Sequence, residues 1–467
     1  MLLNFSQKNW SARERNAGNG VNIPFKTKTM LKPLSESPME KFIKIESLSG
    51  VLLFSATLLA VVWANSPFGA TYQQLWGYEL GVKITNFELV KPLILWINDG
   101  LMAIFFFLIG LEIKRELSVG ELNSAKKAVF PLFAAIGGIA FPALVFVLVN
   151  KDPETLGGWA IPMATDIAFS LAIMKLLGDR VPLNLKVFLT AFAIVDDLGA
   201  VLIIALFYST GIKWMLILIA FALVGLLLLL SIRGWYSKYL LLVIGAVVWL
   251  LFLKAGIHPT IAGVLLAFTV PIQRKVNLPD FMSSLDALQE KIRKAPVGKN
   301  GLLSKEQIEH IDNLDDWTTE VQSPLQRLEH KLHDWVAYVI MPIFALSNAG
   351  VTVSADTALN TNLILGIALA LILGKAVGIY LMSNLALRLG VSKLPDGVRN
   401  IQILGVSFLA GVGFTMSIFI ANLAFKGNPE LLDSAKVGIL IGSLVAGLTG
   451  YFLLRALGNS KTEGTQL

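Results

Sequence analysis

Long apolar segments recur along almost the whole chain, and their length constrains the fold more than any other feature. A helix needs roughly 20 predominantly apolar residues to cross a hydrocarbon core of about 30 Å. Only 15% of the residues are charged, whereas soluble domains carry about 25%. The sequence therefore predicts an all-α polytopic membrane protein with about 12 transmembrane helices, near residues 48–65, 93–113, 128–149, 158–177, 186–208, 213–232, 238–254, 257–272, 336–353, 362–387, 401–425 and 436–456.

Basic residues alternate between the two sets of loops that these spans define. The positive-inside rule assigns the richer set to the cytoplasm, so we expect both termini to be cytoplasmic. The net charge of +7 is spread over these loops, a distribution that topology explains better than nucleic-acid binding. The polar N-terminal region has no apolar core of a signal peptide. We expect a cytoplasmic N-terminal tail at 1–47, transmembrane helices 1–8 at 48–272, a cytoplasmic insertion at 273–335, helices 9–12 at 336–456 and a cytoplasmic C-terminal tail at 457–467.

Two connecting segments have internal patterns of their own. The 273–335 loop holds nine basic and eleven acidic residues in helical patterns, with a capping-box candidate at Ser304 and Gln307. This composition favours a solvated insertion over a catalytic domain. The segment Gly81–Val90 alternates apolar and polar residues around Thr85 and Asn86, which predicts a β-hairpin.

Four charged residues lie near the middle of predicted spans. They are Asp166 in the fourth span, Asp196 and Asp197 in the fifth, and Lys375 in the tenth. Each costs about 2.5–3.5 kcal/mol at a helix centre, so unpaired they would cost on the order of 10 kcal/mol. Structural ion pairing with Lys375 would explain only one carboxylate. An ion or proton pathway is the better interpretation. The absence of cysteine excludes thiol and disulfide chemistry.

Asp196 and Asp197 are adjacent, which separates their directions. Consecutive residues on a helix point about 100° apart, because 3.6 residues make a turn. One carboxylate can therefore face a central cavity while the other faces a neighbouring helix. We expect two different roles.

The fourth and eleventh spans contain helix-breaking residues at their centres. Pro162 removes a backbone donor four residues before Asp166, and Gly405, Gly411 and Gly413 interrupt the eleventh span. Either could be an ordinary kinked helix. However, each is the middle member of a three-span group, and interruptions at matching positions indicate a transporter's binding site.

Broken helices would expose partial charges at their ends, of roughly ±0.5. Asp166 is negative and lies at the right depth to compensate the positive N-terminal ends of the broken helices. Lys375 is positive and lies at the right depth to compensate their negative C-terminal ends. Thr165 adds a hydroxyl oxygen of the kind that hard cations prefer.

Four motifs in the chain resemble one known family. "WINDGLMAIFFFLIGLEIKREL", "IPMATDIAF", "AIVDDLGA" and "GVGFTMSIFIANLAF" are similar to the NhaA family of bacterial Na+/H+ antiporters, and the similarity extends from about Ser47 to Arg455. The resemblance implies a bacterial inner-membrane protein with inverted repeats, whose fourth and eleventh helices are broken and cross at the midplane. It implies electrogenic exchange of Na+ or Li+ for protons. It also implies no cofactor beyond the transported ions.

The resemblance also assigns residues. It places Na+ at Asp196 and Asp197 as ion-binding and proton-carrying groups, Asp166 and Thr165 at the helix crossing, and Lys375 beside the first aspartate of the pair. It implies a pH-sensing cluster that contains Glu112, Arg115, Glu116 and Glu329, with His258 and Asp99 as further candidates. An ordinary charged helix end would explain the first group equally well. His258 could simply cap or pack, and Asp99 could be the N-cap of the second span.

The hairpin resembles the family's dimerisation element, which favours a homodimer within the lipid bilayer. The N-terminal tail and much of the 273–335 loop exceed the family's usual core. We therefore predict a secondary transporter rather than an enzyme, in which protons and Na+ compete for the same carboxylates and activity rises toward alkaline pH.

Two alternatives remain. An intramembrane aspartyl protease also uses two membrane carboxylates, but it places them on separate helices, one in a Gly-x-Gly-Asp turn. In this chain Phe414 follows Gly413, and both central aspartates are on one helix. A sodium symporter would need a large cavity for an organic substrate.

Overall fold

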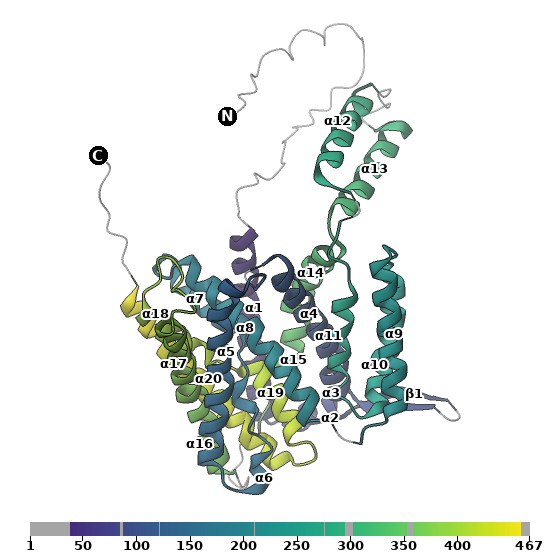
Figure 1. Cartoon of the computed structure of the whole chain (residues 1–467). Helices are drawn as coiled ribbons and strands as arrows, with labels where there is room; N and C mark the ends of the chain where they lie inside the picture. Colours follow the sequence, from purple (N-terminus) through teal and green to yellow (C-terminus); the bar gives the residue numbers. More distant parts are fainter. Residues whose placement is uncertain are drawn as a thin grey trace, which may run out of the picture. The chain divides into compact units, whose positions relative to one another are not determined.

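The structure, a computed structural model, describes residues 38–84, 87–120, 122–209, 211–274, 276–294, 302–352 and 359–458. Most of both predicted tails, and the turn at Thr85 and Asn86, lie outside these residues. The described chain is mainly helical (Figure 1). The transmembrane region predicted before the insertion contains α1 (Pro38–Ala64), α2 (Gly69–Gly77), α3 (Leu93–Trp96), η1 (Ile97–Leu101), α4 (Met102–Val119), α5 (Ala125–Val149), α6 (Pro153–Leu156), η2 (Ile161–Met163), α7 (Ile167–Leu176), η3 (Gly178–Arg180), α8 (Leu183–Phe207), α9 (Trp214–Ile232), α10 (Lys238–Ala255) and α11 (Thr260–Thr269).

The remaining helices belong to the insertion and to the last third of the chain. They are α12 (Leu278–Lys294), α13 (Lys305–Val321), α14 (Pro324–Trp335), η5 (Val336–Ile340), α15 (Met341–Asn348), α16 (Thr361–Leu369), η6 (Ala370–Gly374), α17 (Lys375–Arg388), α18 (Asn400–Ala410), α19 (Phe414–Ala424) and α20 (Pro429–Leu457). α12 packs against α13. Ser304 and Gln307 form both hydrogen bonds of the predicted capping box at the start of α13.

Helix length supports fewer spans than the sequence predicts. Within the described residues, seven helical segments are long and apolar enough to cross a membrane, and three bent helix pairs bring the number to at most ten. The predicted span 257–272 contains α11, of 10 residues, and the predicted span 336–353 contains η5 and α15, of 5 and 8 residues, which continue α14 without a break. In the first of these segments the apolar residues continue beyond the helix, and in the second the apolar helix follows the polar helix α14, so neither forms a long apolar helix of its own.

Two of the bent pairs are the predicted broken helices. The segment Pro153–Met163 is bent from α7 by 49°, and α18 is bent from α19 by 46°. Gly411 and Gly413 lie at the second break with negative φ angles, so close approach and not backbone conformation requires glycine there. A Cβ on Gly411 would lie 2.3 Å from the carbonyl oxygen of Leu371. Gly405 lies inside α18, away from the break, where it packs against Leu454.

α5 and α17 pack with their backbones in contact. A Cβ on Gly137 would lie 2.1 Å from the oxygen of Gly378, and a Cβ on Gly378 would lie 2.2 Å from the oxygen of Gly137. Further along, Gly374 meets Pro142, so the two helices run antiparallel. α17 begins at Lys375, whose Nζ reaches Thr165 beside the first of the two breaks.

The predicted hairpin is present. β1 (Glu79–Ile84) pairs with antiparallel β2 (Phe87–Pro92), with Gly81 opposite Val90. Elsewhere, α9 and α10 pack on each other and on α11 (Figure 1). Trp214, Met215 and Leu218 of α9 are 64–71% exposed, an apolar surface that a bilayer would cover.

Candidate ion-binding site

The two helix breaks lie directly against each other. The backbone N–H of Asp166 donates to the oxygen of Val412 over 2.7 Å, and the hydroxyl of Ser417 donates to the oxygen of Ile161 over 2.8 Å. These bonds pair backbone groups that each break leaves without a helical partner. The crossing therefore holds its unwound peptides in fixed positions inside the protein.

Asp166 accepts hydrogen bonds from the first turns of two helices. It is the N-cap of α7, where Oδ1 accepts from the N–H of Phe169 over 3.2 Å. Its Oδ2 accepts from the N–H of Thr415 over 3.1 Å and from the Thr415 hydroxyl over 2.6 Å, in the first turn of α19. A carboxylate between two helix N-termini is stabilised by both dipoles, as we expected for Asp166.

Lys375 lies between Asp196 and Thr165. Its Nζ is 2.7 Å from Asp196 Oδ2 and donates to Thr165 Oγ1 over 2.7 Å. The Thr165 hydroxyl in turn donates over 3.0 Å to the oxygen of Ala410, the last residue of α18. Lys375 thus reaches a helix C-terminus through Thr165 and pairs directly with the first aspartate of the adjacent pair.

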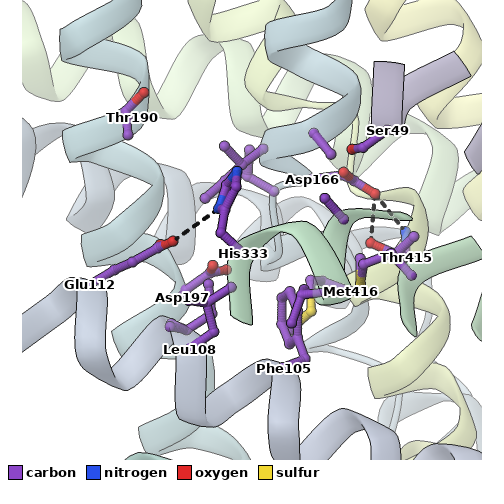
Figure 2. Close-up of a pocket in the computed structure, with 17 residues that line it drawn as sticks. Ser49, Phe105, Leu108, Glu112, Asp166, Thr190, Asp197, His333, Thr415 and Met416 are labelled. Carbon is purple, nitrogen blue, oxygen red and sulfur yellow. Dashed lines mark hydrogen bonds and ion pairs between the residues drawn. The ribbon is translucent and has the colours of Figure 1, made fainter. Parts of the chain in front are cut away.

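Asp197 points away from this ion pair into a cavity. The cavity, of about 60 Å³, is lined by Asp197, Asp166, Thr165 and Thr415 and reaches Glu112 and His333 (Figure 2). At roughly 10–15 Å³ per water position, it holds a few water molecules or a hydrated ion. Asp197 is 1% exposed, and its Oδ1 has no hydrogen-bond partner within the described part of the chain. The adjacent aspartates therefore have different surroundings, as their 100° separation predicts.

A cluster of charged residues includes Glu112 and His333, which line the cavity. Arg115 lies 2.8 Å from Glu116 Oε1 and 3.3 Å from Glu329 Oε1, so its charge compensates both carboxylates. Glu112 Oε1 lies 4.0 Å from Nδ1 of His333. Burial raises the pKa of Glu329, Arg115 opposes this shift and Glu116 adds to it.

His258 and Asp99 form a separate group with Lys91. Asp99 Oδ2 is 2.7 Å from Lys91 Nζ, and Asp99 Oδ1 is 3.7 Å from His258 Nε2. Asp99 lies within η1 and caps no helix, so the N-cap alternative for this residue is wrong. Nδ1 of His258 lies 2.7 Å from the hydroxyl of Thr260.

Sequence reasoning missed several residues of this region. Thr415 lies inside a quoted motif, and its position two residues after Gly413 could have identified it. His333 joins the cavity one helical turn after Glu329. The third omission is an amide network: Asn98 and Asn348 donate to each other over 3.1 and 2.8 Å, and Asn422 donates to Asn348 over 3.0 Å.

The chain is similar to known transporters over nearly its whole length. The family model described as Na+/H+ antiporter 1 matches residues 40–454. The Na(+)/H(+) antiporter NhaA of Oleidesulfovibrio alaskensis is 48% identical over 90% of this chain and 94% of that protein. The protein of the same name from Proteus mirabilis is 44% identical over 90% of this chain and 97% of its own length. The Na(+)/H(+) antiporter NhaA 1 of Saccharophagus degradans is 43% identical over 91% and 93%. With a match of this extent, the chain belongs to the NhaA family of Na+/H+ antiporters.

Proposed function

We propose that this protein extrudes Na+ or Li+ in exchange for a larger number of protons, with Asp197 as the principal group for which cation and proton compete. The observation that carries the proposal is the environment of Asp197: a buried carboxylate with one oxygen unpartnered among the described residues, at the wall of a cavity of about 60 Å³. Hard cations favour such oxygen ligands. A cavity of this size suits an inorganic ion better than the organic substrate of a symporter.

The neighbouring residues have supporting roles in this mechanism. Asp166 and Thr165 line the same cavity and supply oxygens near the cation. Asp196 is the second proton carrier, and its carboxylate either pairs with Lys375 or binds a proton. The ion pair between Asp196 and Lys375 therefore breaks during the exchange of cation and proton. Protonation of the carboxylates releases Na+ on one side, and Na+ binding expels protons on the other. Exposure of the site to each side in turn couples the two gradients.

The proposal extends to the membrane topology, the dimer and the response to pH. We infer twelve membrane-spanning segments in two inverted repeats, with α11 and η5–α15 supplying the two short spans and both termini in the cytoplasm of a bacterial inner membrane. The reciprocal contact between Gly137 and Gly378 supports a repeat in which the third and tenth spans are equivalent. The insertion at 273–335 is cytoplasmic, and the hairpin of β1 and β2 joins two protomers. The cluster of Glu112, Arg115, Glu116 and Glu329 adjusts activity to pH.

Transport in membrane vesicles tests the proposal. In everted vesicles that have built a pH gradient, added Na+ or Li+ should dissipate it, and K+ should not. An imposed membrane potential should change the rate in proteoliposomes if exchange is electrogenic. The variant Asp197→Asn should abolish the Na+ response, whereas Asp286→Asn in the exposed part of α12 should not. A response that requires an organic solute, or Na+-dependent proton release by Asp197→Asn, would contradict the assignment.

A further inference from the structure

Ser49 of α1 is the least expected side chain in the cavity wall. It is 2% exposed and lines the cavity together with Asp166, Thr165 and Asp197. It comes from the first helix, which carries none of the charged residues that sequence reasoning singled out. Figure 2 draws its hydroxyl next to the Asp166 carboxylate.

The other hydroxyl groups of the cavity are already engaged. Thr165 donates to Ala410 and accepts from Lys375. The hydroxyl of Thr190 donates to the backbone oxygen of Lys186. As described above, Thr415 donates to the Asp166 carboxylate.

Ser49 differs from these groups and from its neighbours on α1. Helical serine and threonine hydroxyls commonly bond to the carbonyl four residues earlier, as Ser55 and Thr57 do. The Ser49 hydroxyl has no hydrogen-bond partner within the described residues. Both of its lone pairs therefore remain available to a ligand in the cavity.

Helix packing fixes Ser49 at this place. The adjacent Gly50 lies against α7: a Cβ there would be 2.5 Å from the Cβ of Ala172 and 3.3 Å from the backbone oxygen of Ala168. α1 and the first turn of α7 are thus in direct contact at Gly50. Because Asp166 caps that first turn, this contact keeps Ser49 in the cavity wall that Asp166 also lines.

We propose that Ser49 is a ligand of the transported cation and favours Na+ over Li+. This inference rests on the proposed function and adds an oxygen to the shell formed with Asp197 and Asp166. A neutral hydroxyl oxygen suits a hard cation and leaves the charge balance of the exchange unchanged. Na+ has the larger coordination shell of the two ions, so the loss of one protein oxygen affects Na+ more than Li+.

The test compares Ser49→Ala with Ser55→Ala, which removes an intrahelical hydroxyl from the same helix. Na+ and Li+ are titrated separately against the pH gradient of proteoliposomes that contain each full-length variant. In Ser49→Ala, the apparent KM for Na+ should rise about three- to tenfold, the change expected for one ligand bond of about 1 kcal/mol. The KM for Li+ should rise less, while the maximal rate and the melting temperature stay unchanged. Ser55→Ala should match the wild type.

The ratio of the KM for Na+ to the KM for Li+ in Ser49→Ala shows whether Ser49 binds the cation or only packs between helices. A purely structural role would shift both ions equally or lower the maximal rate, and either result overturns the proposal. Unchanged KM values in Ser49→Ala, with a wild type that responds to Na+, overturn it while leaving the proposed function intact. A wild type without any response to Na+ or Li+ overturns both.

Discussion

Replacement of Lys375 by methionine should strongly destabilise the protein. Lys375 and Asp196 are both 0% exposed at their side chains and lie 2.7 Å apart. The second oxygen of Asp196 has no partner among the described residues, so Lys375 is the only cation that the structure shows against this carboxylate. Lys375→Met would leave a buried charge uncompensated, which costs about 3–5 kcal/mol when one partner of a buried pair is removed.

A second substitution distinguishes charge from packing. In Asp196→Asn/Lys375→Met the carboxylate is replaced by a neutral group of the same shape, so more than half of the lost free energy of unfolding should return. Replacement of a whole buried pair by neutral groups is often nearly neutral. A loss that stems from packing around the lysine stem would persist in the double variant.

Equilibrium unfolding of the purified protein in detergent at neutral pH measures these free energies. Lys83→Met is the matched control, because the Lys83–Glu88 pair is similar in geometry, at 3.1 Å, but 71% and 61% exposed. An exposed pair contributes little to stability. Two results would contradict an uncompensated charge as the cause: a loss in Lys375→Met no greater than in Lys83→Met, or a double variant no more stable than Lys375→Met.

Three further substitutions probe the crossing, the amide network and the charged cluster. Gly413→Ala should cost about 1–3 kcal/mol of unfolding free energy, because its Cβ would lie 2.6 Å from the backbone oxygen of Ala164; chemical denaturation measures this loss. Asn348→Leu should cost at least about 2 kcal/mol in the same assay, because it leaves the buried amide of Asn98 unpaired. Glu329→Gln should remove part of the pH dependence of stability. The pKa of Glu329 is raised in the folded state, so its contribution is present below the usual carboxyl pKa and is lost as pH rises through the raised value; melting temperatures across that range measure the loss.

Each of these has a matched control. Gly225→Ala adds a methyl group where no atom lies within 4 Å and should cause no loss. Asn184→Leu removes a single exposed hydrogen bond. Glu306→Gln removes an exposed carboxylate of α13 and is the control for Glu329→Gln. A control that behaves like its test variant would contradict the corresponding explanation.

The positions of the buried charges could be predicted because few solutions exist for a charge inside a membrane. A carboxylate near an interrupted helix has helix N-termini as partners, which is where Asp166 lies. A lysine at the same depth needs a carboxylate, and Lys375 pairs with Asp196. The period of the helix then predicts that Asp197 faces elsewhere. In each case a large desolvation penalty leaves one favourable arrangement.

Neutral polar groups are harder to predict, because burying them costs little free energy and they can bond to many different partners. Thr415 and Ser49 are ordinary residues of apolar helices, and only the crossing and the contact between α1 and α7 bring them to Asp166. Gly405 was predicted to lie at a break because a glycine inside a membrane helix can mark either a kink or a close contact. Its neighbour in space, Leu454, is far away in the sequence.

The amide network lies near the N-terminal end of the helical segment Leu93–Val119, whereas the cavity lies along its middle, from Phe105 to Glu112. This arrangement bears on the proposed transport cycle. Asn98 precedes Glu112 by 14 residues, so roughly 21 Å separate them along the helix axis at 1.5 Å per residue. At the Glu112 end, the cavity reaches Asp197. At the Asn98 end, amides from η1, α15 and α19 bond to one another, and Asn348 is 0% exposed. In the proposed cycle, exposure of the site to the other side separates α19 from α15 and breaks the hydrogen bond between Asn422 and Asn348. The side-chain amides of Asn422 and Asn348 are neutral, so this hydrogen bond breaks without any change in protonation. We therefore expect the pH dependence of transport to reside in the charged cluster and the aspartates.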